Sequence, residues 1–178
     1  MKKMLRYGLV VLAIAFAAVL AISPVTTLGD YPPKVQEALN QTMMIELFGD
    51  LLASQNISIG FGDIGRHIAD VTKGSYNLTI NNSYAGANVS VIKALLAHEL
   101  THIKWAANGT GALVTGNLTF AEEYDCFKTE AGVWREHKGG LTDGELDAGE
   151  NVIFTNGEYR NKDEVKTTLE GAGYTFSG

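Results

Sequence analysis

The sequence predicts a single domain of the α+β class, and three observations support that prediction. Helical hydrophobic patterns cover residues 31–54, 89–107 and 120–137. Short alternating apolar segments lie together between residues 57 and 80. Because the helix and strand patterns occupy separate parts of the chain, they favour a small sheet packed against helices. The length of 178 residues allows one ordinary domain.

The N-terminal part of the domain is expected to contain one helix and three strands. Pro32 or Pro33 suits the first turn of the helix, where a backbone N–H needs no partner, and the helical pattern extends to about residue 54. Alternating apolar and small residues predict strands at 57–64, 68–71 and 76–80.

Two longer helices follow, and each ends at a glycine stop. The helix expected at 89–107 ends at Asn108-Gly109, and the helix at 120–137 ends at Gly139-Gly140. Residues 143–150 resemble a calcium loop but lack its required Gly and Glu, so they are interpreted as a solvated acidic turn. The last expected elements are a strand at 152–155, a helix at 162–169 and a strand at 171–176.

Residues 1–29 are expected to be an export signal. Three basic residues within the first six positions precede an apolar stretch at 8–22, which is the order of a secretory signal peptide. The stretch is shorter than the ~20 residues of a membrane-spanning helix, and an uncleaved N-terminal anchor is the alternative. In both cases residues 30–178 form a domain that is secreted or lies at the cell surface, with membrane contact only through residues 1–29.

Composition excludes several classes of protein. The net charge of −6 and the lack of a basic stripe argue against nucleic acid as a partner. One cysteine excludes an intramolecular disulfide framework and a Cys-rich zinc module. Seven Asn-x-Ser/Thr sequons favour a glycosylated exported protein, the alternative being a chance result of an Asn- and Thr-rich chain. The sequons are Asn40, Asn56, Asn77, Asn81, Asn88, Asn108 and Asn117.

The strongest functional signal is the segment His98-Glu99-Leu100-Thr101-His102, an HExxH sequence inside the helix expected at 89–107. The i, i+4 spacing places both imidazoles on one face, one turn apart, so that both can bind one Zn²⁺. Glu99 lies one step round the helix, where its carboxylate can take a proton from a water polarised by zinc and pass it to a leaving amine. The alternative is a core face with two hydrogen-bonded histidines.

The same helix divides into two rows of side chains. One row, expected to be buried, contains both histidines of the motif together with apolar residues. The opposite row is expected to face solvent. The buried row is Val91, Leu95, His98, His102 and Trp105, and the solvent row is Lys93, Ala97, Thr101 and Lys104.

A third protein ligand leaves the fourth position of a catalytic zinc open. Glu123 lies near the inward face of the helix at 120–137, whereas Glu122 lies far from it. Thr119-x-x-Glu122 is also a capping box, which assigns Glu122 to the helix start. Glu123 is therefore the predicted ligand, with Glu122 as the competing choice and an ordinary boundary carboxylate as the alternative for Glu123.

HELTH on one helix and a glutamate on the next, about twenty residues on, resemble the gluzincin class of zinc metallopeptidases. Size and element order resemble its minimal members, the minigluzincins, over residues 90–134. The resemblance implies a backing helix, a small twisted sheet, an active-site helix and a glutamate helix. It also implies His98, His102 and Glu123 as zinc ligands, Glu99 as general base, and hydrolysis of peptide or protein substrates.

Two features depart from the pattern of larger gluzincins. The Asp that commonly follows the ligand glutamate by four residues is absent, because Cys126 follows Glu122 and Phe127 follows Glu123 at that spacing. No downstream residue is marked as the group that stabilises the oxyanion. The candidates for that role are His137, Tyr159 and Tyr174.

The resemblance further implies a peptide-binding edge strand before the active-site helix, for which residues 76–80 are the candidate. Glycans on Asn77 and Asn81 would restrict access to that edge. Cys126 is interpreted as a small, partly buried residue, with a zinc-ligating latency switch as the alternative, and His67 is interpreted as structural. The competing function is a catalytically silent, zinc-stabilised binding module at the cell surface. Glu99 argues against that function, because a structural zinc site needs no unligated acid.

Overall fold

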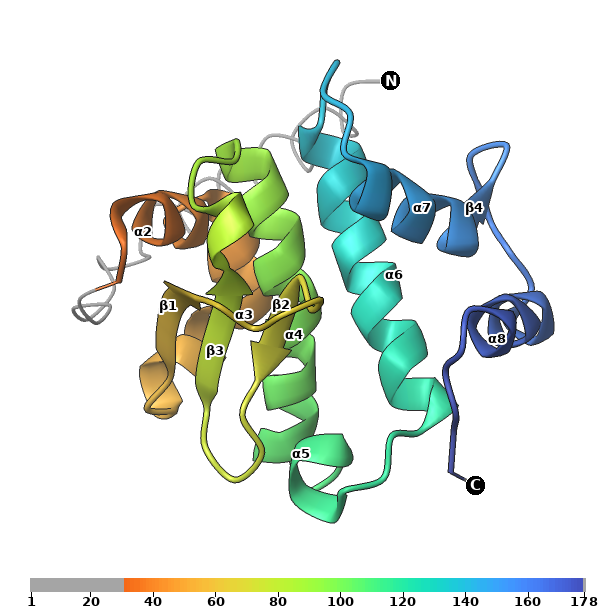
Figure 1. Cartoon of the computed structure of the whole chain (residues 1–178), viewed down its shortest axis with the longest axis horizontal. Coiled ribbons are helices and arrows are strands. Elements are labelled where there is room, and N and C mark those ends of the chain that lie inside the picture. Colours follow the sequence, from red (N-terminus) through yellow and green to blue (C-terminus); the bar gives the residue numbers. More distant parts are fainter. Residues whose placement is uncertain (1–30, 178) are drawn as a thin grey trace, which may run out of the picture.

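The computed structural model describes residues 31–177 and has a mixed α+β fold, as predicted (Figure 1). The export signal expected at residues 1–29 lies outside the described residues. Within the described residues, every helix is too short or too polar to cross a membrane. In chain order the elements are α2 (Pro33–Leu39), α3 (Thr42–Ser54), β1 (Ser58–Gly62), β2 (Ala69–Val71), β3 (Asn77–Asn81), the 3-10 helix η1 (Asn82–Tyr84), α4 (Val89–Ala107), α5 (Ala112–Thr115), α6 (Phe120–His137), α7 (Gly144–Ile153), β4 (Phe154–Thr155), β5 (Glu158–Tyr159) and α8 (Lys162–Gly171).

The three-stranded sheet has the order β1-β3-β2. Strand β1 pairs parallel with β3, from Ser58 opposite Asn77, and β2 pairs antiparallel with β3, with Val71 opposite Leu78. The expectation that residues 76–80 form an edge strand is therefore wrong, because β3 is the central strand. Strand β2 forms the edge that packs beside α4. Strand β3 is central because β1 pairs with it in parallel, although β2 separates these two strands in the sequence.

The helix expected at 31–54 is two helices, α2 and α3, with a break at Asn40-Gln41. Gln41 has extended backbone angles (φ −70°, ψ 140°), so the chain turns before α3 begins. An uninterrupted helix would carry its i+4 apolar row away from one face. The break lets both α2 and α3 pack against α4 and bury Leu39 and Phe48 in the same core.

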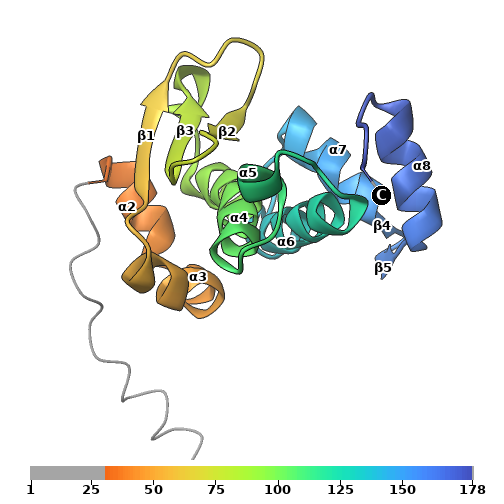
Figure 2. The same ribbon diagram turned by 90° about the horizontal axis from the view of Figure 1, so that it is seen from below.

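Helix α4 lies in the middle of the molecule, between the sheet on one side and α6 on the other (Figures 1 and 2). Its expected solvent row is largely wrong: Lys93, Ala97 and Thr101 are buried, and only Lys104 is exposed. Helices α2 and α3 pack against α4, and this covers a face that the residue pattern assigned to water. A helix buried on several sides is well suited to hold side chains in fixed positions.

The C-terminal part forms a second apolar cluster around α6, α7 and α8. The acidic segment is the helix α7 rather than a turn, because the Asp143 side chain accepts hydrogen bonds from the N–H groups of Glu145 and Leu146 and caps it. The strand expected at 152–155 is shorter, and the strand expected at 171–176 does not form. Instead, Tyr174 and Phe176 pack against aromatic residues of α6.

Candidate metal centre

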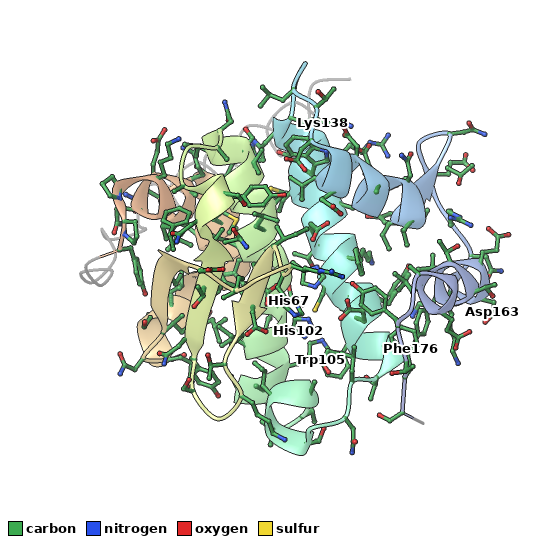
Figure 3. All side chains as sticks on the ribbon, in the orientation of Figure 1. His67, His102, Trp105, Lys138, Asp163 and Phe176 are labelled. Carbon is green, nitrogen blue, oxygen red and sulfur yellow. The ribbon has the colours of Figure 1, made fainter. Side chains whose placement is uncertain are left out.

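The HExxH segment on α4 faces the first turns of α6, and Figure 3 shows His102 on the side of α4 that faces α6. His98 and His102 lie one turn apart, with ring centroids 5.2 Å from each other. His98 Nε2 lies 3.7 Å from Glu123 Oε1, and His102 Nε2 lies 3.4 Å from Glu123 Oε2. The three predicted ligands therefore meet at one place, with the same ring nitrogen of both histidines directed at one carboxylate.

The opposite ring nitrogen of each histidine contacts a second carboxylate. His102 Nδ1 lies 2.7 Å from Glu122 Oε1, a hydrogen bond. His98 Nδ1 lies 2.9 Å from Glu130 Oε2, although its N–H is not aligned with that oxygen. A carboxylate at Nδ1 favours the tautomer whose Nε2 carries a free lone pair, and it fixes the orientation of the ring. Both imidazoles are thus arranged as Nε2 ligands.

Glu122 has a different role from the predicted cap. Thr119 does cap α6, because its hydroxyl accepts from the Glu122 N–H at 3.3 Å. The Glu122 carboxylate, however, is fully buried and points away from the helix start. Its Oε1 contacts His102, and its Oε2 accepts from the N–H of Ala112 at 2.8 Å. Glu122 therefore holds a histidine and the start of α5, and Glu123 is the glutamate that faces both Nε2 atoms.

Sequence reasoning missed Glu130. It lies two helical turns after Glu123 on α6, and only 7% of it is exposed. The signal that could have found it is this seven-residue spacing, which brings two residues to nearly the same face of a helix. Glu130 is the carboxylate that lies beside Nδ1 of His98.

Cys126 belongs to the same cluster. Its Sγ and one ligand atom each of His98, His102 and Glu123 all lie within 4.8 Å of one another, and this group could hold a metal ion. Cys126 is fully buried rather than partly buried. Two imidazoles, a carboxylate and a thiol are donors that zinc accepts. The residues present therefore fit a zinc ion by their chemistry.

Electrostatic coupling within the cluster is strong. Burial alone would lower the pKa of His102, but contacts with Cys126 and Glu122 outweigh it and raise that pKa above its ordinary value. Burial alone would raise the pKa of Glu123, but the nearby imidazoles of His102 and His98 outweigh it and lower that pKa. These shifts favour protonated imidazoles beside an ionised Glu123. Because metal ligands must be deprotonated, a metal ion would compete with protons for these groups.

Glu99 does not join the cluster of ligand atoms, and it lines two recesses that meet at the site. One has a volume of about 290 Å³ and is lined by polar groups that include Arg66, His67 and Tyr174. The other, of about 230 Å³, has a more apolar wall that includes Leu113 and Leu118. Ala69 of the edge strand β2 lines both. The site therefore opens along β2, and His67, interpreted as structural, is an exposed residue of this opening.

The three candidates for oxyanion stabilisation lie in different places. Tyr174 lines the recess that contains Glu99. Burial and the negative charge of Glu123 raise the pKa of Tyr174. Tyr159 is 57% exposed in the β4–β5 hairpin, and His137 Nε2 lies 3.3 Å from Met43 Sδ. Of the three, Tyr174 is the residue at the site.

A larger recess of about 560 Å³ lies elsewhere, lined in part by Met43, Trp105 and Tyr159, and it contains none of the donor groups described above. Comparisons with known proteins add no assignment: the chain matches no protein-family model, and neither curated proteins nor solved structures gave a match. The function is therefore inferred from the residues of the cluster and their geometry.

Proposed function

We propose that the protein is an exported zinc metallopeptidase that hydrolyses peptide bonds. His98, His102 and Glu123 are its metal ligands, and Glu99 is its general base. The observation that carries the proposal is the convergence of both HExxH Nε2 atoms on Glu123, beside a Glu99 that remains free to face the opening. The gluzincin arrangement of a backing helix, small sheet, active-site helix and glutamate helix is part of the same proposal.

Zinc, when bound, supplies a Lewis acid that polarises a substrate carbonyl and acidifies water. Glu99 supplies the proton transfer, holding the proton taken from water and delivering it to the leaving nitrogen. Burial raises the pKa of Glu99, partly offset by His98 and His102, and a raised pKa helps a carboxyl to carry that proton. We assign to the Tyr174 hydroxyl the donation of a hydrogen bond to a developing oxyanion, because Tyr174 lines the same recess as Glu99.

Strand β2 is the proposed substrate edge. It borders the opening through Ala69, and an extended peptide can add to a free strand edge by main-chain hydrogen bonds. The sequons at Asn77 and Asn81 belong to the central strand β3 and not to β2. The side chain of Asn81 is already engaged, donating to the carbonyls of Gly65 and His67.

A zinc-stabilised binding module without catalytic activity is the second candidate, and Cys126 is the observation in its favour. A fourth protein ligand would complete a closed structural site. Glu99 separates the two candidates, because a closed structural site has no role for an unligated carboxyl at the opening. Export and glycosylation belong to the proposal in both cases; the exposed side chains of Asn40, Asn56, Asn108 and Asn117 are accessible to glycan transfer.

Glu99→Gln tests the proposal. We expect hydrolysis of a quenched fluorescent peptide to fall by about 10²–10⁴-fold, the usual contribution of general acid–base catalysis, while metal analysis still gives about one zinc per chain. Glu145→Gln is the matched control, since Glu145 is an exposed carboxyl that lines the same recess. Unchanged hydrolysis by Glu99→Gln would exclude Glu99 as the general base. Zinc binding without peptide hydrolysis in both wild type and Cys126→Ala would favour the binding module.

Tyr174→Phe tests the second catalytic assignment. We expect kcat to fall by about 10²–10³-fold with zinc content and KM little changed, because the hydroxyl acts on the oxyanion formed in the transition state. Tyr159→Phe is the control, removing a hydroxyl from an exposed ring outside the site. Equal kcat values for the two variants would exclude Tyr174 from this role.

A further inference from the structure

Cys126 is the only cysteine of the chain, and its surroundings are those of a ligand. It follows Glu123 by three residues on α6, so both side chains lie on neighbouring positions of one helix face. Cysteine in an apolar core behaves as a small hydrophobic residue. The Cys126 sulfur instead lies within 4.8 Å of one ligand atom each of His102 and Glu123.

The arrangement of the four donors is the second observation. The ligand atoms of Cys126, His98, His102 and Glu123 lie within 4.8 Å of one another, so no donor is separated from the rest. The two imidazoles are already oriented by Glu122 and Glu130 at Nδ1, which leaves their Nε2 atoms facing Glu123, the residue three positions before Cys126. Cys126 is also fully buried, so its sulfur has no alternative partner in solvent.

We propose that Cys126 is a fourth protein ligand of the metal, and that its thiolate closes the resting site. This rests on the proposed function, because it places the same metal on His98, His102 and Glu123. Thiolate is a donor that zinc prefers, and four protein ligands are typical of a closed site, whereas three leave a position for water. The protein then has a latent form, and catalysis requires Cys126 to leave the metal.

The step that forms this bond is balanced without a redox partner. The S–H bond of Cys126 breaks, a sulfur–metal bond forms, and the proton goes to solvent, as in other thiolate sites. When Cys126 leaves the metal, the sulfur–metal bond breaks and the thiolate takes a proton from solvent. Latency of this kind needs no other segment of the chain to cover the opening.

Cobalt substitution tests the proposal without measuring activity. Metal-free full-length wild type, Cys126→Ala and Cys126→Ser are titrated with Co²⁺ and followed by absorption. We expect a sulfur-to-cobalt charge-transfer band in the near ultraviolet for wild type and its loss in both variants, each of which still binds one Co²⁺ per chain. Because a ligand is lost, we expect the variants to bind metal at least about 10-fold more weakly.

The outcomes separate this proposal from the proposed function. One Co²⁺ per wild-type chain without the sulfur band would overturn the role of Cys126 and leave the His98-His102-Glu123 centre standing. No metal bound by wild type would overturn both. Cys126→Ser retains a residue of similar size, so it gives the same comparison if Cys126→Ala does not fold. Peptide hydrolysis by the zinc-loaded variants is expected to exceed that of wild type.

Discussion

The two ends of the candidate metal centre are built differently, although each presents an imidazole with a glutamate at its Nδ1. At the His102 end, Glu122 is fully buried and its two oxygens accept from two separate N–H groups, those of His102 and Ala112. At the His98 end, Glu130 contacts the ring alone and lines an open polar recess. The Glu122 carboxylate is thus held through both oxygens, whereas the contact of Glu130 with His98 uses one oxygen.

The His102 end is expected to stabilise the structure, and the His98 end is expected to control access to the site. At the His102 end, the Glu122 side chain links α4, α5 and α6. A change there is expected to affect both the fold and the proposed metal binding. The His98 end lies beside Arg66, His67 and Tyr174, where substrate is proposed to enter. A change there is expected to affect the site and to spare the fold.

The largest expected difference between the two ends, in metal affinity and in stability, comes from replacing Glu122 or Glu130 by glutamine. In Glu122→Gln, an NH₂ group replaces one of the two acceptor oxygens. Because the NH₂ group must then face the N–H of His102 or of Ala112, that buried N–H loses its acceptor. We expect metal affinity to fall by about 100-fold and the free energy of unfolding of the metal-free protein to fall by about 1–3 kcal/mol. Glu130→Gln keeps an acceptor for His98, so we expect about a 10-fold loss of affinity and little change in stability.

Competition with a chelator measures the affinities, and urea unfolding of the metal-free proteins measures stability. Wild type and Glu145→Gln, which removes an exposed carboxyl, are the references. If Glu130→Gln destabilises the fold as much as Glu122→Gln does, the two ends are equivalent and the comparison fails.

Local signals predicted the helices of the site well. The bounds expected for α4 and α6 agree with the structure, because a glycine stop follows α4 and the Thr119 cap begins α6. The strand order could not be predicted, because the parallel pairing of β1 with β3 depends on contacts between separated segments. The Asp143 cap was present in the sequence, but the resemblance of this segment to a calcium loop favoured a turn over the helix that Asp143 begins.

In the candidate site too, features that depend on one helix were predictable, and features that depend on contacts between elements were not. The i, i+4 spacing brought His98 and His102 together, and the angle around α6 distinguished Glu123 from Glu122, because both depend on one helix at a time. The partners of Glu122 and Glu130 depend on how α4, α5 and α6 cross. The capping box assigned Glu122 to the nearest donor in the sequence, whereas the nearest donors in space are on other elements.

A smaller effect is expected from alanine substitution of two glycines, Gly111 beside Glu122 and Gly149 beside Glu130. Gly111 has φ +85°, and a Cβ there would lie 2.9 Å from Trp105 Cβ and 3.0 Å from Glu122 Oε1. Gly111→Ala therefore combines a strained backbone with a contact to an atom fixed to the main chain. We expect the free energy of unfolding to fall by about 1–3 kcal/mol.

Gly149, in α7, is the counterpart at the His98 end. A Cβ there would lie 2.5 Å from Glu130 Oε1, the far end of a flexible side chain, and its backbone is helical. Alanine also favours a helix over glycine by up to about 1 kcal/mol, so we expect Gly149→Ala to leave stability within about 1 kcal/mol of wild type. Displacing Glu130 from His98 is expected to weaken metal binding by no more than about 10-fold. Urea unfolding and chelator competition on both variants check the contrast, and a Gly149→Ala protein less stable than Gly111→Ala would show that Glu130 is as firmly fixed as Glu122.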